Sequence, residues 1–496
     1  MTTPNLLFLF TDEQRADTMA AYGNDRIEMP NLNRLASQSV VFDRAYVTQP
    51  VCTPSRSTLL TGLYPHTNGC TANNVPLPAD VPAFPEMLER DTWTTGYHGK
   101  WHLGDEIFRQ HGFDEWRSIE DMYIPYYSAG RSRDARSDYH HFLVEAGHAP
   151  KDGSLFRRTE TARFPEAVSR PAYLAREASR FIRENRERPF CLFVNFLEPH
   201  MPFFGPRDAQ HDPQTITLPE NFDHPPTADQ PLKTRLFQKH YEQNGHGGFP
   251  LRTETDWRAM IGRYWGLCSL VDTHVGTILR TLTECGLDGN TVVVYTSDHG
   301  DMMGSHRLLA KCVMFEEAAR VPMLVRLPGQ TRGRHVAGPV SQVDLVPTLL
   351  ELMGQSIPDR LEGKSLAPLM TGDGVSAVDD VFVEWNGTNS GITADVIGRA
   401  EVPAHLREFA SVDEAASAVG DPVRSVVTAD GWKFNCSVRG DHELYNLNDD
   451  PHELHNLAFD AETTTLIAGL LDRIRRWQQQ TRDVVQLPPP PYQRSR

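Results

Sequence analysis

Residues 6–13 read Leu-Leu-Phe-Leu-Phe-Thr-Asp-Glu, a run of five apolar residues that leads into two acidic ones. A short continuous apolar run is typical of a parallel strand that is buried on both faces. Residues 190–200 and 291–300 repeat the pattern, because they end in Glu-Pro-His and in Ser-Asp-His-Gly. Three such strands, each with polar groups at its carboxyl end, predict an open α/β sheet with a site along that edge.

Segments with apolar residues at helical spacing separate these strands, and they lie at residues 30–38, 172–185 and 257–285. The alternation predicts a sheet with helices on both faces. After about residue 370 the pattern changes: residues 432–437 and 443–447 indicate short antiparallel strands, and residues 461–480 a closing helix. We expect a catalytic domain over residues 1–372 and a smaller α+β domain over residues 373–496.

The tail of the smaller domain contains four consecutive prolines, Pro488–Pro491. Proline-rich segments are extended and semi-rigid. Such an arm packs on its own chain, packs on a neighbouring chain or stays loose.

Composition limits the possible partners. The chain of 496 residues has 49 basic and 65 acidic side chains, a formal charge of -16. This balance argues against a general nucleic-acid or anionic-membrane surface, since both need basic patches. A small anionic substrate remains compatible with it, because charges more than about 8 Å apart are screened at physiological salt.

The cysteines and the amino terminus indicate the compartment. The seven cysteines show no paired spacing, which favours a reduced protein over a disulfide scaffold or a zinc site. The first apolar run is too short for a signal-peptide core or a membrane span. We therefore expect a cytoplasmic protein with no membrane partner.

Residues 50–62 read Pro-Val-Cys-Thr-Pro-Ser-Arg-Ser-Thr-Leu-Leu-Thr-Gly, which predicts a helix beginning just after Cys52. Free backbone N–H groups and the helix dipole favour an anion at that end. Arg56 lies one turn further along the same face. Taken alone, Cys52 is a buried thiol at a helix start, or a thiolate nucleophile activated by the dipole and Arg56.

This segment resembles, residue for residue, the signature of the formylglycine-dependent sulfatases in Cys52, Pro54, Ser55 and Arg56 and in Leu-Leu-Thr-Gly at residues 59–62. The resemblance implies an alkaline-phosphatase-like mixed sheet, hydrolysis of sulfate monoesters and a formylglycine made from Cys52. It also implies a formylglycine-generating enzyme as a partner during maturation and, by analogy with related cytoplasmic enzymes, a homo-oligomer.

The resemblance extends over most of the chain. Residues 99–104, Gly-Lys-Trp-His-Leu-Gly, are similar to the core of the family's second signature, although Thr-Trp at residues 92–93 stands where that signature usually opens with Gly-Tyr. Similarity continues through residues 320–322, 343–348, 443–447 and 450–451. It is weakest at residues 105–170 and 375–430, where such families usually build substrate specificity.

The resemblance assigns one divalent cation to acidic residues at strand ends. The implied ligands are Asp12, Glu13, Cys52, Asp298 and His299. Carboxylate oxygens favour calcium, and a single imidazole leaves manganese or magnesium open. Many family members have two aspartates where this chain has Asp12 and Glu13, so the role of Glu13 is the least determined.

The remaining implied roles belong to groups around the formylglycine. Asp298 deprotonates its hydrate for attack on sulfur, and His200 or Lys311 protonates the leaving alcohol. His102 takes the proton of the second hydroxyl, so that the aldehyde reforms and sulfate leaves. Arg56, Lys100 and Lys311 join the cation in stabilising negative charge.

Three alternatives stay open. A phosphonate monoester or phosphodiester hydrolase shares the same formylglycine and metal architecture, but its signature more often has alanine where this chain has Ser55. A binding protein that has lost the chemistry would lack Cys52, Arg56, Lys100 or Asp298, and all four are present. A phosphotransferase with an unmodified nucleophile would have threonine or serine at position 52. The alcohol of the sulfate ester, whether aryl, choline-like or saccharide, is not determined by the sequence.

Overall fold

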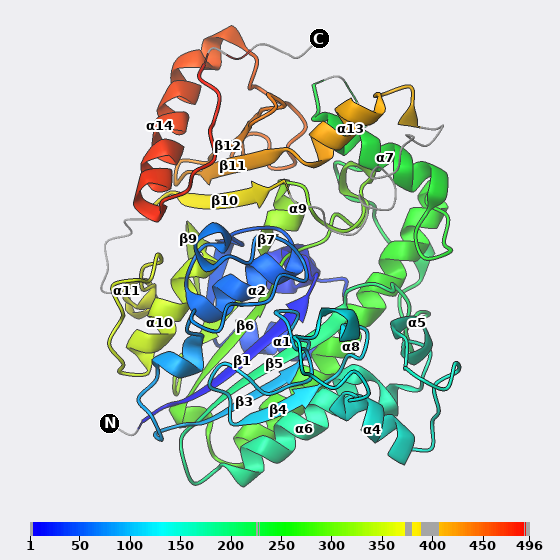
Figure 1. The fold of residues 1–496 in the computed structure, drawn as a ribbon, viewed down its shortest axis with the longest axis vertical. Helices are drawn as coiled ribbons and strands as arrows, with labels where there is room; N and C mark the ends of the chain where they lie inside the picture. Colours follow the sequence, from blue (N-terminus) through cyan, green and yellow to red (C-terminus); the bar gives the residue numbers. More distant parts are fainter. Residues whose placement is uncertain are drawn as a thin grey trace.

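A computed structural model describes residues 3–224, 227, 229–372, 379–387, 406–490 and 492. These residues form a nine-stranded sheet (Figure 1) in the order β4-β3-β5-β1-β6-β8-β2-β7, with β9 paired to β2. Its strands are β1 (Asn5–Asp12), β2 (Val40–Tyr46), β3 (Thr94–Gly99), β4 (Glu115–Ser118), β5 (Phe190–Pro199), β6 (Thr291–Ser297), β7 (Arg320–Val321), β8 (Met323–Arg326) and β9 (Arg334–Ser341).

The centre of the sheet consists of the three apolar strands that the sequence predicted. β1 pairs in parallel with β5 on one side and with β6 on the other, so that Leu9 lies between Val194 and Tyr295. β8 runs antiparallel to β6 and to β2, which makes the sheet mixed. The predicted α/β class is therefore confirmed, and the carboxyl ends of β1, β5 and β6 meet at one edge.

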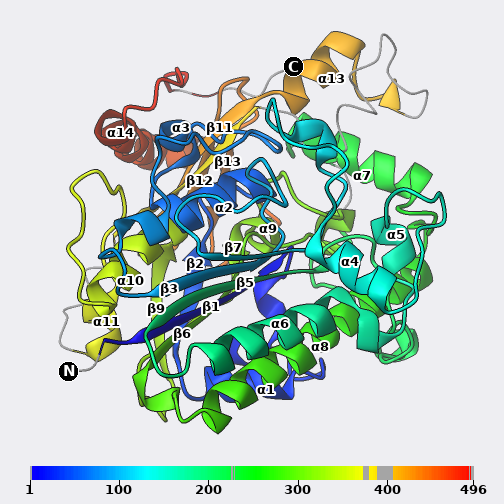
Figure 2. The same ribbon diagram turned by 60° about the horizontal axis from the view of Figure 1, so that its bottom comes forward.

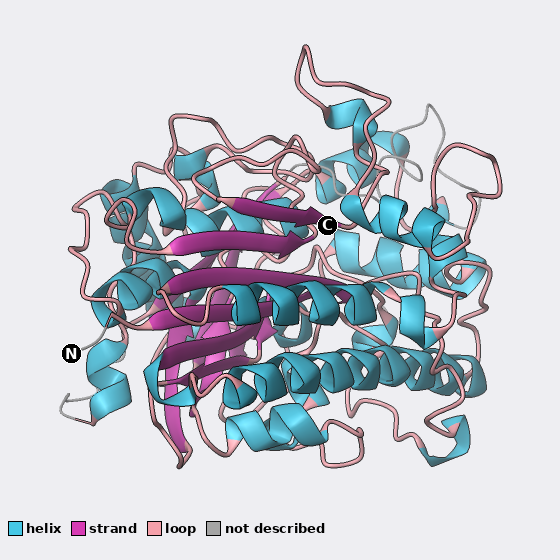
Figure 3. Cartoon of the chain, turned by 90° about the horizontal axis from the view of Figure 1, so that it is seen from below, coloured by secondary structure: helices cyan, strands magenta, loops and turns pink. Residues whose placement is uncertain are grey.

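Helices cover both faces of this sheet (Figures 2 and 3). Leu7 and Leu9 point into a core shared with α1 (Pro30–Ala36), α6 (Arg170–Glu184) and α8 (Glu254–Glu284). Phe8 and Phe10 point into a second core, shared with α2 (Cys52–Thr61) and α10 (Leu345–Leu352). Burial on both faces explains why the strand sequences are apolar without alternation.

The predicted helices are found with shifted ends. α8 begins at Glu254, three residues before the expected start, because Thr253 and Asp256 form a capping box there. The other α-helices are α3 (Pro65–Asn68), α4 (Asp138–Glu145), α5 (Arg158–Thr161), α7 (Leu232–Asn244), α9 (Glu316–Ala319), α11 (Ala367–Thr371), α13 (Val412–Val419) and α14 (Thr464–Thr481).

A second, four-stranded antiparallel sheet has the order β10-β11-β12-β13. Helix α14 packs on it through Ile467, Leu471 and Trp477 (Figure 1). The predicted strands at residues 432–437 and 443–447 are β12 and β13, and the predicted closing helix is α14. The strands are β10 (Val381–Asn386), β11 (Pro422–Val427), β12 (Trp432–Ser437) and β13 (Glu443–Asn446).

The tail packs on this smaller sheet as far as it is described. The Tyr492 ring lies 3.8 Å from the His442 ring and 6.1 Å from the Phe434 ring, centroid to centroid. Among the three possibilities for the proline-rich arm, contact with its own chain is the one observed. The boundary between residues 372 and 373 stays a prediction, because residues 373–378 lie outside the described part.

Two further observations concern the chain as a whole. None of the described helices combines the length and the hydropathy that a membrane crossing requires. None of the seven cysteines, all within the described part of the chain, forms a disulfide, and Cys52 is among the buried ones.

Candidate active site

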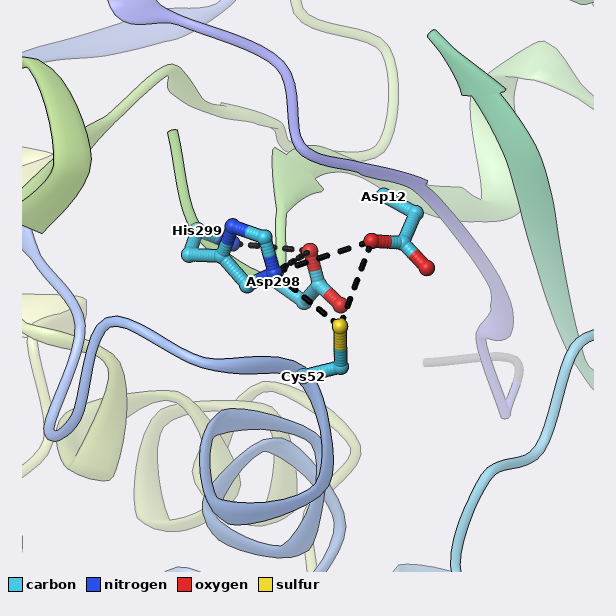
Figure 4. Close-up of side chains that lie close together, drawn as sticks. All are labelled: Asp12, Cys52, Asp298 and His299. Carbon is cyan, nitrogen blue, oxygen red and sulfur yellow. Dashed lines mark hydrogen bonds and ion pairs between the residues drawn. The ribbon is translucent and has the colours of Figure 1, made fainter. Parts of the chain in front are cut away.

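Four neighbouring parallel strands deliver polar side chains to one point beyond their carboxyl ends. β1 ends at Asp12, β6 is followed by Asp298, β5 by His200 and β3 by Lys100. Cys52 enters from the first residue of α2, and Figure 4 shows its sulfur pointing at the acidic residues. The structure therefore brings together the site residues that the sequence separates by hundreds of positions.

Cys52 lies at the centre of this arrangement and is 2% exposed. Its Sγ is 3.6 Å from Asp12 Oδ1 and 3.2 Å from His299 Nε2 (Figure 4). Burial and the neighbouring Asp12 carboxylate raise the pKa of the Cys52 thiol to about 11. The surroundings thus disfavour an activated thiolate, one of the two interpretations open for an isolated Cys52.

The cluster offers ligand atoms of the types that a divalent cation uses. One ligand atom from each of Asp12, Cys52, Asp298 and His299 lies within 4.8 Å of the others. His299 Nδ1 faces the carbonyl of Gly300 at 2.8 Å, so its hydrogen is donated there and Nε2 presents a lone pair to the carboxylates. This second contact orients the imidazole as metal-binding histidines are oriented.

Glu13 points into the site, from a backbone with φ 70. Both of its carboxylate oxygens are buried and make no hydrogen bond among the described residues. Lys311 Nζ lies 3.0 Å from Oε1 and His200 Nε2 lies 3.6 Å from Oε2. Burial raises the pKa of Glu13 to about 8. A buried carboxylate that is paired with Lys311 and borders Asp12 and His200 fits a position beside a cation.

Arg56 holds the site together from within. Nε is 2.8 Å from Asp298 Oδ2, Nη2 is 2.9 Å from Asp12 Oδ2, and Nη1 donates to the Lys100 carbonyl and to Asn195 Oδ1. These contacts use four of the five guanidinium hydrogens. Arg56 therefore fixes the positions of Asp12 and Asp298, and these two carboxylates offset most of its positive charge.

Lys100 and His102 stand on the β3 side of Cys52. Lys100 Nζ pairs with Asp12 Oδ2 at 2.5 Å. His102 has φ 58, its backbone N–H donates to Glu106 Oε2, and its Nε2 lies 3.0 Å from Asn74 Oδ1. His102 Nδ1 is buried and has no partner among the described residues. This nitrogen is free to exchange a proton with a bound group.

His200 and Lys311 stand next to Glu13. His200 Nδ1 lies 2.8 Å from the Met201 carbonyl, which leaves Nε2 directed into the site. Burial and the charge of Lys311 lower the pKa of His200. Both residues thus contact the Glu13 carboxylate. They could act on the same region of a substrate.

Sequence reasoning missed the residues that position this machinery. Asn195 lies within an apolar strand, where it accepts from Arg56 and donates to the Phe10 carbonyl at 3.1 Å. Its polar side chain inside the run at residues 190–196 was a visible signal. Asn74 and Glu106 gave no such signal, because both belong to loops whose contacts depend on the fold.

The sequence of this chain is similar to those of known sulfatases. A family model described as Sulfatase matches residues 4–355. A choline-sulfatase of Rhizobium meliloti is 29% identical over 481 residues, which cover 92% of this chain and 83% of that protein. An ulvan-active sulfatase of Formosa agariphila is 29% identical over 384 residues, which cover 74% of this chain and 65% of that protein.

Among solved structures, a phosphonate monoester hydrolase from Silicibacter pomeroyi superposes with a TM-score of 0.75 at 22% identity, covering 96% of each chain. Likeness at this identity shows a shared fold. The mixed sheet flanked by helices and the small antiparallel sheet are thus those of the alkaline-phosphatase-like group, as the resemblance in the signatures implied.

Proposed function

The chain belongs to the sulfatase family, and from this membership we propose that it hydrolyses a small anionic sulfate monoester through a formylglycine made from Cys52. Family members hydrolyse sulfate esters, and the proposal adds the nucleophile, the cation and the residue roles. One observation carries it: Cys52 begins α2 with its sulfur directed at Asp12 and His299.

The donor set supports one divalent cation. Asp12, Glu13, Asp298 and His299 would hold it together with the side chain at position 52. Oxygen donors predominate, which favours calcium, with manganese or magnesium as the alternatives. When bound, the cation supplies positive charge that offsets the charge of the sulfate and of the nucleophile.

The chain's own residues divide the remaining work between the two sides of Cys52. Lys100 and Lys311 flank the position that a sulfate group would occupy, and each carries charge toward it. Asp298 accepts the proton of the attacking hydroxyl, and His102 accepts the second proton when sulfate is released. His200 or Lys311 gives a proton to the leaving oxygen, since both nitrogens face the same side of the site.

An aldehyde explains why a cysteine stands where related phosphotransferases have a hydroxyl. A formylglycine hydrate offers one hydroxyl for attack on sulfur and a second one for the release of sulfate, without a further attack of water on sulfur. This requires a formylglycine-generating enzyme as a maturation partner. The proposed cytoplasmic location rests on the scattered cysteines, and the proposed homo-oligomeric state rests on the analogy with related enzymes.

The test combines a mass measurement with two substrates. Protein from its native host is digested, and the peptide with Pro50 and Arg56 is examined for the aldehyde at Cys52. Turnover of 4-nitrophenyl sulfate and of a 4-nitrophenyl phosphonate ester is measured in parallel. The proposal expects the aldehyde and a preference for sulfate; a preference for the phosphonate would assign the chain to that alternative activity.

Two variants complete the test. Cys52→Ala removes turnover and keeps the melting temperature within a few degrees, because its side chain lies in a polar site outside both cores. Cys70→Ala is the matched control, since Cys70 is also buried but belongs to the second core. Unmodified Cys52 in native material together with full sulfatase turnover would overturn the mechanism.

A further inference from the structure

Residues 119–169, between β4 and α6, form a wall beside the candidate site. The Tyr123 ring lies 4.6 Å from the His102 ring, centroid to centroid. Arg158, the first residue of α5, donates from Nη2 to the Tyr123 hydroxyl at 2.9 Å. Two contacts therefore connect this wall to a residue of the proposed machinery.

Arg158 is held firmly on one side and is open on the other. Its Nε donates to Glu120 Oε2 at 2.6 Å, and its Nη2 binds the same oxygen. Nη1 makes no hydrogen bond within the described part of the chain, and the side chain keeps 14% of its surface exposed. One end of a fixed guanidinium is thus available to a ligand.

The Tyr123 hydroxyl is available in the same way. It accepts the hydrogen bond from Arg158, so its own hydrogen points elsewhere. No acceptor for this hydrogen exists among the residues that the structure describes. Two donors, one of them charged, therefore stand side by side next to His102.

One carboxylate is shared by two guanidiniums next to Tyr123. Glu120 lies between Arg158 and Arg170, whose Nη2 is 3.3 Å from Glu120 Oε1. Burial alone would raise the pKa of Glu120, but the two guanidiniums lower it, so this carboxylate is charged and offsets only one of them. Burial raises the pKa of Glu198, the other carboxyl near Arg170. Arg170 Nε is buried without a hydrogen-bond partner in the described chain.

Arg158 is joined to His102 through Tyr123. A group bound to Arg158 would therefore lie beside Tyr123 and His102, next to the candidate site. The sulfate group itself would lie between Lys100 and Lys311, so a group beside Arg158 belongs to the alcohol part of the substrate.

We propose that Arg158 Nη1 and the Tyr123 hydroxyl bind a second anionic group, a carboxylate or a second sulfate, on the alcohol part of the substrate. The inference rests on the proposed sulfate-ester hydrolysis and narrows its substrate class. A neutral alcohol would leave the free guanidinium donors facing water, and a choline-like alcohol would be repelled. Anionic aryl or saccharide sulfates are the class that fits.

The experiment uses matched esters that differ in one charge. Phenyl sulfates with a carboxylate at the 2, 3 or 4 position are compared with the carboxamides of the same shape, and benzene-1,3-disulfate tests a second sulfate. We expect kcat/KM for at least one anionic ester to exceed that of its amide by about tenfold or more, as a charged hydrogen bond gives. The calcium-loaded full chain is used throughout.

Variants assign this preference to Arg158. Arg158→Met should bring the ratio of anionic to neutral ester close to one, and Tyr123→Phe should lower it in part. Arg157→Met is the matched control, because Arg157 is the preceding residue, 75% exposed and paired with Asp152. If Arg158→Met fails to fold, the double variant Glu120→Gln/Arg158→Met is used in its place, because it removes both charges of the ion pair together. Comparing each ratio with wild type cancels the different acidity of the leaving phenols.

Failure of the subsite and failure of the proposed function give different results. Turnover of the amide esters tests sulfate hydrolysis, whereas the ratio tests the subsite. If no ester is turned over, binding of the same pairs to Cys52→Ser protein is measured by calorimetry. Equal values for anionic and neutral esters in all pairs, or a preference that Arg158→Met leaves intact, would overturn the inference.

Discussion

Asp12 is the residue at which the charges of the site meet. It contacts Arg56 at 2.9 Å and Lys100 at 2.5 Å, and it faces Cys52 and His299 at 3.6 Å each. Burial alone would raise its pKa, but the neighbouring Lys100, His200, Arg56 and Lys311 lower it, the two lysines and the arginine through their fixed positive charge. A fully buried carboxylate is thereby kept ionised, in the form that binds a cation.

Glu13 provides a prediction at the same scale. Glu13→Gln should weaken calcium binding by about tenfold or more, because a neutral amide oxygen replaces a carboxylate that can lose its proton when the cation binds. Isothermal calorimetry on metal-free protein measures the Kd directly. The matched control is Glu198→Gln, a buried carboxyl outside the cluster of ligand atoms, which should keep the wild-type Kd. A Glu13→Gln protein that binds calcium as tightly as wild type would place Glu13 outside the coordination shell.

The sequence predicted some residues of the candidate site and missed others. The signatures identified Cys52, Asp12 and Asp298, because each follows a strong local pattern. Asn74 and Glu106 escaped, since their importance lies in contacts with His102 that form only when two loops fold together. Local patterns reveal residues that do chemistry, and they reveal less about residues that hold others in place.

At the scale of elements, the close contact between the carboxyl ends of β3 and β5 determines where the Lys100 side chain leaves the sheet. Gly99 ends β3 with φ +126 and pairs with Asn195 of β5. A Cβ built on Gly99 would lie 2.0 Å from the Asn195 carbonyl oxygen. Neither backbone can move without disturbing the partners of Arg56 and Lys100, so only glycine fits this position.

Gly99→Ala should therefore lower stability by about 2 kcal/mol or more and reduce turnover with it. Thermal melting and kcat/KM on one aryl sulfate measure both effects. Gly289→Ala is the control, because Gly289 has no neighbour within 4 Å and lies outside the left-handed region. If Gly99→Ala matched the control in both measurements, the tight contact between the two strands would not position Lys100.

The elements themselves were largely predictable. The apolar runs of β1, β5 and β6 are long, bounded by polar residues and buried on both sides, so pattern and environment agree. The start of α8 was placed too late, since the signal of its capping box lies in Thr253 and Asp256, before the apolar spacing begins. The wall with Tyr123 and Arg158 was not predictable, because its contacts join short elements in a segment without a signature.

At the scale of the whole molecule, buried histidines connect stability to pH. His442 is 2% exposed, beside the rings of Phe434 and Tyr492, and its Nδ1 accepts from the Ser437 N–H at 3.2 Å. Burial lowers the pKa of His442 to about 4 from an ordinary value of 6.5. The unfolded chain gains this proton first, so stability present above pH 6.5 is lost as the pH falls toward 4.

His442→Asn should flatten that dependence, because the amide oxygen can accept the Ser437 hydrogen bond without titrating. The loss of unfolding free energy between pH 7 and pH 5 should be about 2 kcal/mol smaller than in wild type. Urea unfolding at the two pH values measures it, and the comparison cancels the pH dependence of calcium binding. An equal loss in both proteins would show that His442 titrates normally in the folded chain.

The depth of Cys52 determines when the chain can mature. All ten residues of α2 are buried, and Cys52 itself is 2% exposed. An enzyme that oxidises this side chain must bind the surrounding segment, and the folded protein does not present it. The proposed conversion therefore has to precede folding, so that competition between the rates of conversion and folding would set the active fraction. Folded, unmodified protein should stay unconverted when mixed with a formylglycine-generating enzyme, whereas a peptide of residues 46–62 should be converted; mass spectrometry distinguishes the two.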